Sequence, residues 1–147
     1  MSGRGLMIGG LVVLVAFTTA LWWFQTRAFY EEIPATAIIQ TPAGAIAVAG
    51  FSGIQASSSP LKLRACMTLD PADVSGLEFA SDAEPLVAPR WFECFDAKSL
   101  SRAIDAGRAA AYALGPTEAD GIDRMLAVYP DGRAFLWHQL APKFANQ

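Results

Sequence analysis

The sequence has few charged residues and no concentration of positive charge. Asp, Glu, Lys and Arg make up 17% of its 147 residues, and the formal net charge is -3. Soluble domains have roughly 25% charged residues. Lys62 and Arg64 form the only cationic cluster, whereas nucleic-acid binding needs a basic surface that follows the phosphate backbone. We therefore expect no nucleic-acid partner.

Residue types that carry chemistry are also scarce. The chain contains one histidine, His138, and two cysteines, Cys66 and Cys94. No serine or cysteine near His138 lies in a recognisable nucleophile motif, so a partly exposed strand residue is its simplest interpretation. Spacing marks no pair of carboxylates as acid and base, and the acidic residues beside turns and helix starts are expected to act as caps: Glu93, Asp96, Asp120, Asp123 and Asp131. We expect no catalytic residue, no cofactor, no resident metal ion and no enzymatic activity.

An uncharged run of twenty residues, Gly5–Phe24, begins close to the N-terminus. At 1.5 Å per residue, about 20 residues cross a hydrocarbon core of roughly 30 Å. A cleaved signal peptide is the alternative, but its apolar core usually has about 7–15 residues before a small-residue cleavage site. This run ends in Trp22, Trp23 and Phe24, which suit the membrane interface. We predict a retained transmembrane helix.

The orientation of this helix is less directly encoded. Arg4 precedes the span and Arg27 follows it, so the positive-inside rule is nearly balanced. A short N-terminal tail favours a cytoplasmic N-terminus, which exports the rest of the chain. An even number of cysteines in an exported domain suggests a disulfide, whereas cytosolic thiols stay reduced. We therefore expect a single-pass protein of the inner (cytoplasmic) membrane with a periplasmic domain.

The pattern after the anchor predicts one small α+β domain over residues 31–147, with residues 1–30 forming the anchor and an interfacial segment. From Leu61 to Leu69 apolar and polar residues alternate, which is typical of a strand with one buried face. Arg64 and Cys66 lie on the polar face. Residues 44–51 predict a short strand, and residues 53–60 are expected to form loops.

One helix and one hairpin complete the predicted domain. Apolar residues recur at helical spacing from Leu100 to Leu114 behind a cap at Asp96 or Ser99. Gly115-Pro116 would end that helix. Residues 124–129 and 134–140 predict strands joined by the turn Pro130-Asp131-Gly132-Arg133. The result is a mostly antiparallel sheet, one amphipathic helix and a C-terminal β-hairpin, with no structural signal after residue 142.

The two cysteines allow two interpretations. Cys66 and Cys94 are 28 residues apart, which is neither a CxxC redox motif nor a zinc knuckle. A disulfide that closes this loop would stabilise a small domain by about 3 kcal/mol. The alternative is a Cu(I) site formed with His138 and a methionine such as Met67, because thiolates and thioethers suit that ion. Met67 points to the opposite side of its strand from Cys66, so we favour the disulfide.

Two sets of residues are candidates for contact with a partner. Gly5, Gly9 and Gly10 place small residues on the predicted span, and Gly5 and Gly9 have the small-xxx-small spacing that lets helices approach closely. The second set consists of aromatic residues, which are enriched at interfaces: Phe29, Tyr30, Trp91 and Phe92. Packing in a core is the simpler interpretation for the last two.

The chain also resembles a family of short, uncharacterised alphaproteobacterial proteins that have one N-terminal anchor and a domain of unknown function. The resemblance rests on six segments: residues 28–30, 57–61, 64–66, 91–96, 121–124 and 137–139. It implies a membrane-anchored topology over nearly the whole chain. It implies no activity and no catalytic residue.

These observations favour a non-enzymatic accessory or assembly subunit of an inner-membrane complex, with respiratory or photosynthetic electron-transfer complexes as the expected hosts. The expected partners are the membrane and an integral membrane protein complex. A membrane-tethered periplasmic module that binds a ligand or handles copper is the alternative, and an enzyme is the third. Co-purification with a complex in mild detergent distinguishes the first from the second.

Overall fold

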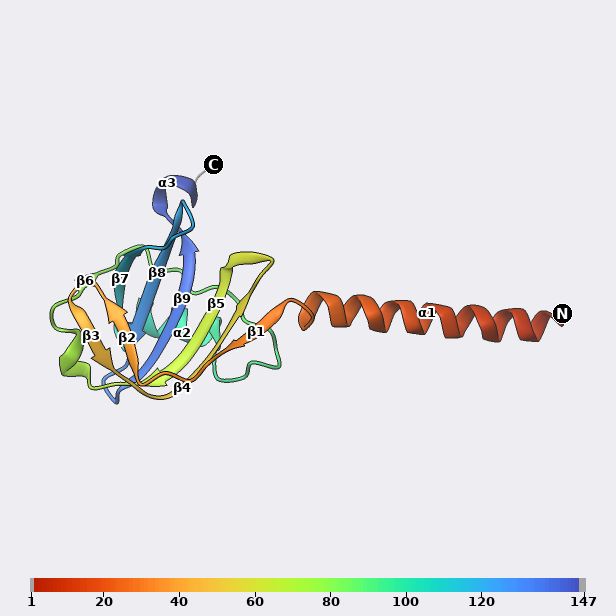
Figure 1. Ribbon diagram of the computed structural model, residues 1–147, viewed down its shortest axis with the longest axis horizontal. Helices are drawn as coiled ribbons and strands as arrows, with labels where there is room; N and C mark the ends of the chain where they lie inside the picture. Colours follow the sequence, from red (N-terminus) through yellow and green to blue (C-terminus); the bar gives the residue numbers. More distant parts are fainter. Residues whose placement is uncertain (1, 146–147) are drawn as a thin grey trace. The chain divides into compact units, whose positions relative to one another are not determined.

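A computed structural model describes residues 2–145 of the chain, which divides into two compact units, Met1–Tyr30 and Glu31–Gln147. The first unit contains one helix, α1 (Gly3–Thr26) (Figure 1). Its mean hydropathy reaches 2.1, and its length of about 36 Å is enough to cross a membrane. Three threonine hydroxyls donate to carbonyls four residues earlier, as polar groups in lipid require: Thr18, Thr19 and Thr26. The predicted N-terminal apolar helix is confirmed.

The second unit is built on a seven-stranded sheet with the strand order β1-β4-β5-β9-β8-β7-β6. Its strands are β1 (Tyr30–Ile33), β4 (Ala49–Ala56), β5 (Ser59–Thr68), β6 (Glu78–Phe79), β7 (Ala110–Pro116), β8 (Ile122–Val128) and β9 (Arg133–Leu140). Five neighbouring pairs in this order are antiparallel: β4–β5, β5–β9, β9–β8, β8–β7 and β7–β6. A separate ribbon pairs β2 (Ile38–Thr41) with β3 (Gly44–Ala47). Three short helical elements complete the unit: η1 (Pro71–Val74), α2 (Ala97–Asp105) and α3 (Pro142–Ala145). The predicted α+β class with a mostly antiparallel sheet is confirmed.

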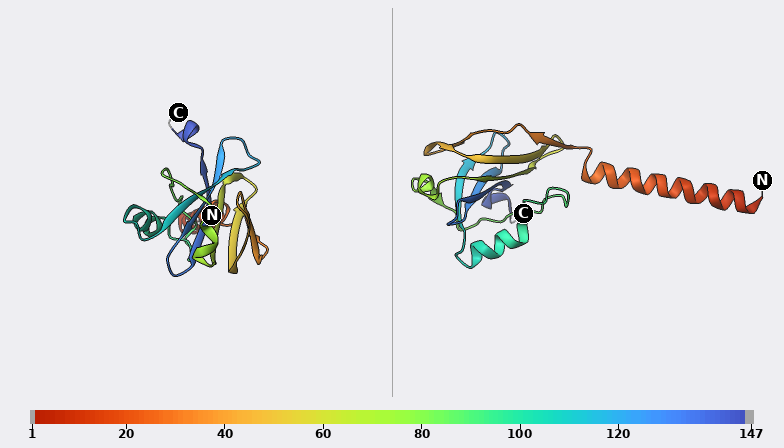
Figure 2. Two further views of the ribbon diagram at one scale, coloured as in Figure 1. Left: turned by 90° about the vertical axis from the view of Figure 1, so that its left-hand side faces the viewer. Right: turned by 90° about the horizontal axis from the view of Figure 1, so that it is seen from below.

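The β2–β3 ribbon covers one face of the large sheet, which we call the ribbon face. Figure 2 shows the ribbon on one side of the sheet and α2 on the other. Side chains alternate between the faces along each strand, so Ala65, Met67 and Leu136 point toward the ribbon. They form an apolar core with the ribbon residues Ile39 and Ile46. This half of the domain is held by ordinary hydrophobic burial.

The opposite face, which we call the helix face, is covered by α2 and by the irregular segment 80–96. Phe95 packs edge-on against Phe135 and Trp137, with ring centroids 6.0 and 6.4 Å apart. Trp137 is fully buried, and Leu100 and Ala103 of α2 are 3% and 1% exposed. Asp96 begins α2, because its carboxylate accepts hydrogen bonds from the amide and hydroxyl of Ser99. Both faces of the large sheet are therefore buried.

Three buried groups of the sheet tie segment 80–96 in place. Gln139 Oε1 accepts a hydrogen bond from the amide of Glu84 at 2.8 Å, and its Nε2 donates to the carbonyl of Asp82 at 2.8 Å. Arg64, 4% exposed, donates to the carbonyls of Leu86 and Val87 at 2.9 and 3.3 Å. The third tie is covalent.

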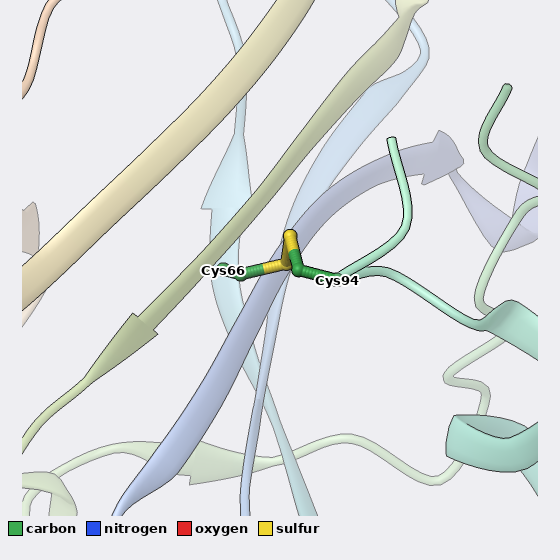
Figure 3. Close-up of a disulfide and its surroundings, with 2 residues drawn as sticks. All are labelled: Cys66 and Cys94. Carbon is green, nitrogen blue, oxygen red and sulfur yellow. A yellow bond between two sulfur atoms is a disulfide. The ribbon is translucent and has the colours of Figure 1, made fainter. Parts of the chain in front are cut away.

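That third tie is the disulfide between Cys66 of β5 and Cys94 (Figure 3). The two Cα atoms are 6.3 Å apart. Cys66 is buried, whereas Cys94 is exposed. The predicted disulfide is therefore confirmed.

The predicted helix over residues 100–114 is wrong in its second half. Helix α2 ends at Asp105, and Gly107 adopts φ +72°, a left-handed conformation that a helix end favours. Residues 110–116 instead form β7, where Ala111 pairs with Ala127. The alanine-rich stretch fits either period, and pairing with β8 overrides its helix propensity. Gly115 lies at a register shift within β7, so it does not cap a helix.

Other predicted boundaries are also corrected. The expected strand over residues 44–51 is split between β3 and β4, and most of the expected loop over 53–60 belongs to β4 and β5. The tail forms the short α3. The C-terminal hairpin of β8 and β9 is confirmed. Its turn needs glycine at position 132 for two reasons. Gly132 has φ +94°, and a Cβ there would lie 2.6 Å from the Leu69 carbonyl oxygen.

The first prediction concerns the Gln139 tie. We expect Gln139→Leu to lower the free energy of unfolding by about 2–3 kcal/mol, because the buried Trp137 Nε1 and the backbone groups of Asp82 and Glu84 lose their hydrogen bonds to the amide. Amides near Glu84 should also exchange with solvent faster in the full chain in detergent. Gln55→Leu is the matched control, since Gln55 is exposed on β4. Equal effects of the two substitutions would contradict the role of Gln139.

The second prediction concerns the disulfide. Without reductant, alkylation and mass spectrometry should leave Cys66 and Cys94 unmodified in the native protein. Reduction should lower the melting temperature by about 10 °C or more, because a cross-link over 28 residues contributes about 3 kcal/mol. The variant Cys66→Ala/Cys94→Ala should melt at the temperature of the reduced protein. Labelling of both thiols in the folded, unreduced protein would refute the bridge.

Candidate functional site

The first candidate site is a groove of about 500 Å³ on the second unit, which we call the Trp91 groove. It is lined by the end of β1 and the residues after it (32–35), by residues 51–54 of β4, and by Trp91 and Phe92. Trp91 is half-buried and Phe92 is buried, and their rings meet edge to face at 6.3 Å. The groove therefore combines a strand at the sheet edge with aromatic side chains from segment 80–96.

Small residues on β4 keep the Trp91 groove open. A Cβ on Gly53 would lie 2.9 Å from the Phe51 ring and 3.2 Å from the Ile33 side chain. Ile54 is 1% exposed beneath it, and Ser52 is exposed. The hollow is consequently determined by β4, which has no bulky exposed side chain at this point.

The second candidate site is a pocket of about 530 Å³, which we call the His138 pocket. Arg124 of β8 and His138 of β9 are cross-strand partners and lie on the ribbon face. Apolar contributions to the wall come from Pro60, Leu63 and Pro116. Residues 117–119 close one side, and Glu118 among them is exposed.

The protonation state of His138 follows from its surroundings. Its Nδ1 lies 2.7 Å from the carbonyl oxygen of Pro60. A carbonyl can only accept a hydrogen bond, so Nδ1 carries the proton and Nε2 holds the lone pair in the neutral ring. Burial lowers the pKa of His138 below its ordinary value of 6.5, and the positive charges of Arg124 and Arg64 lower it further.

The structure places the other predicted site residues as follows. Trp91 and Phe92 come together in the groove, whereas Phe29 and Tyr30 belong to the first unit. The three glycines of α1 predicted to pack against another helix are all exposed: Gly5, Gly9 and Gly10. Asp96 and Asp131 act at a helix start and a turn, where backbone hydrogen bonds lower the pKa of each carboxyl.

The candidate ligands for Cu(I) are not brought together. Cys66 and Cys94 are joined as a disulfide, so neither is a thiolate in this state. Met67 is buried on the ribbon face, on the other side of the sheet from Cys66. Among the described residues 2–145, no three His, Cys, Asp or Glu side chains gather to hold a metal ion.

Sequence reasoning missed the two buried polar residues of the helix face. Arg64 was placed on a polar strand face, and Gln139 was grouped with its neighbours without a role. A signal for Arg64 was present, because Arg64 and Cys66 are two residues apart and share a face. A loop that reaches Cys66 must also cover Arg64, so Arg64 needs internal hydrogen-bond partners.

The third prediction is a pH dependence of stability that arises from His138. The folded protein holds the pKa of this base below 6.5, so the unfolded chain binds a proton more readily. Its contribution to stability is present above that pH and is lost as the pH falls. We expect the melting temperature to drop between about pH 7.5 and about pH 5.5, above the range where carboxyls usually titrate. His138→Asn, which keeps a donor for Pro60, should flatten the curve, and an unchanged slope would contradict the assignment.

Comparison with known proteins connects the domain to one family. No curated protein and no solved structure matches the chain. A family model described as a family of unknown function matches residues 33–146, which is nearly the whole second unit. This match confirms the predicted membership of an uncharacterised domain family. The chain belongs to the family of unknown function DUF6446.

Proposed function

We propose that this protein is a non-enzymatic accessory or assembly subunit of an inner-membrane complex that carries out respiratory or photosynthetic electron transfer. In this proposal α1 is a retained anchor with a cytoplasmic N-terminus, and the sheet domain lies in the periplasm. The observation that carries the proposal is the Trp91 groove, which lies at the end of the strand that directly follows the anchor.

Two features support an exported, anchored domain. Helix α1 has no charged residue between Gly5 and Phe24 and buries none of its side chains within the chain. Such a surface is stable in lipid and costly in water. The Cys66–Cys94 disulfide fits an oxidising compartment, which for a bacterial inner-membrane protein is the periplasm.

The sheet edge supports docking to another protein. β1 is an end strand whose neighbour within the sheet is β4, and the outer edge of an end strand can accept a strand from another chain. Trp91 beside it is of the residue type that most often anchors interfaces. Only residues 27–29 separate α1 from β1, a chain of at most about 11 Å. In an anchored protein this edge stays within reach of the membrane-proximal segments of an integral partner.

The alternative function is a membrane-tethered periplasmic module that binds a ligand or handles copper. Its copper form would need the thiolates of Cys66 and Cys94, which the disulfide consumes. Its ligand-binding form is favoured by the His138 pocket, which has a cationic and an apolar wall. The two functions use different surfaces of the domain.

The fourth prediction tests docking through the groove. Ser52→Trp should fill the groove without removing a buried side chain. It should reduce recovery of the host complex from mild detergent about tenfold, which is the size of effect expected for loss of an interface anchor. Ser57→Trp, exposed in the β4–β5 turn, is the matched control and should leave recovery unchanged. Quantitative mass spectrometry of the affinity-purified full chain gives the measurement.

A second arm of this test concerns the anchor. Replacement of α1 by a poly-leucine helix of 24 residues should lower recovery of the complex while membrane localisation persists, if Gly5, Gly9 and Gly10 pack against a partner helix. Unchanged recovery would make the span a simple tether. Purification of the native protein alone, or a mature N-terminus beyond residue 20, would overturn the proposed function.

A further inference from the structure

We propose that the His138 pocket binds a small organic carboxylate, with Arg124 as the group that holds the carboxylate. The pocket shares no lining residue with the Trp91 groove, so this site is independent of docking. Its volume of about 530 Å³ lies within the range of roughly 300–1,000 Å³ that small-molecule sites occupy.

Arg124 provides the charge for this site. Its Nη2 donates to the carbonyl oxygen of Gln40 at 3.1 Å, which fixes the side chain beside the pocket. Within residues 2–145 no carboxylate forms an ion pair with Arg124. The guanidinium has five N–H donors in a planar fork, a geometry that matches the two oxygens of a carboxylate. The hydrogen bond to Gln40 uses one of these donors, and the guanidinium belongs to a side chain that lines the pocket.

His138 makes binding of an anion proton-linked. Burial and the charges of Arg124 on β8 and Arg64 on β5 lower the pKa of its ring and so favour the neutral form, and Glu118 is the one carboxylate that residues 2–145 contribute to the wall. A bound anion opposes the charge effect, because it lies near the ring and offsets the charge of Arg124. Binding therefore favours the imidazolium, and by linkage the anion binds more tightly at lower pH.

The rest of the wall selects the class of ligand. Pro60, Leu63 and Pro116 offer apolar surface, which suits a hydrocarbon body attached to the carboxylate. The exposed carboxylate of Glu118 opposes a second negative charge. A monoanion with an apolar body therefore fits the pocket better than inorganic phosphate, which is largely a dianion at neutral pH.

The test uses benzoate as the probe and the full chain in detergent micelles. Because the chain has one histidine, isotope-labelled histidine gives a ring signal that belongs to His138 alone. Benzoate should raise the pKa of His138 in a saturable manner, and its Kd should increase as the pH rises. Benzyl alcohol, the neutral analogue, and inorganic phosphate should each have at least about tenfold weaker effects, as expected for loss of a charge-assisted bidentate contact.

Two variants of opposite effect keep the test decisive. Arg124→Gln should weaken benzoate binding about tenfold or more, whereas Glu118→Gln should strengthen it several-fold. Arg108→Gln removes an exposed arginine outside this pocket and should leave the Kd unchanged. The proposal is overturned if benzoate leaves the His138 signal unchanged, if benzyl alcohol or phosphate binds equally well, or if Arg108→Gln weakens binding as much as Arg124→Gln. Tighter binding by Glu118→Gln would support it even if Arg124→Gln failed to fold.

Discussion

The helix face of the sheet depends on one constraint, which is that an irregular segment must cover it. Backbone donors and acceptors in segment 80–96 cannot pair along a regular ladder, so burial beside the sheet would leave them unsatisfied. Gln139 and Arg64 supply partners for the backbone of residues 82–87, and the disulfide at Cys94 holds the segment farther along. Phe95 can then pack on Trp137, and Asp96 can start α2 in a fixed place. The aromatic core of this face is a consequence of these polar and covalent ties.

The two hollows of the domain, the Trp91 groove and the His138 pocket, depend on these ties to different degrees. Trp91 lies three residues before Cys94, so the Trp91 groove depends on a segment that the disulfide holds. Cys94 is exposed, and thiolate attack on a disulfide requires such access. The His138 pocket takes Pro60 and Leu63 from β5, the strand that carries Cys66, but none of its lining residues comes from segment 80–96. The redox state of one bond therefore affects one surface far more directly than the other.

Local patterns in the sequence were sufficient for α1, β5, the C-terminal hairpin and the disulfide. The first three depend on charge, alternation or turn chemistry within a few residues, as in the Pro130-Asp131-Gly132-Arg133 turn, whereas the disulfide was inferred from an even number of cysteines in an exported domain. The residues of β7 were assigned to a helix because an alanine-rich run fits either period until its partner strands are known. Arg64 and Gln139 were missed for a related reason, since a polar residue on a strand suggests solvent unless a covering segment is known. The Trp91 groove joins β1, β4 and residues 91–92, which are far apart in the sequence, so only their separate aromatic and edge signals were available.

Electrostatics separates the two hollows further. The protein is acidic overall, with a formal net charge of -3, yet the His138 pocket presents Arg124 and a ring whose protonated form an anion would stabilise. The Trp91 groove instead carries Glu32 at its edge and neutral aromatic side chains elsewhere. In the proposed roles, Arg124 would attract an anion to the first and Glu32 would repel one from the second, whereas an extended polypeptide would meet the end strand β1 only at the second. In the two proposals a small acid and a protein partner use separate lining residues, so neither would compete directly with the other.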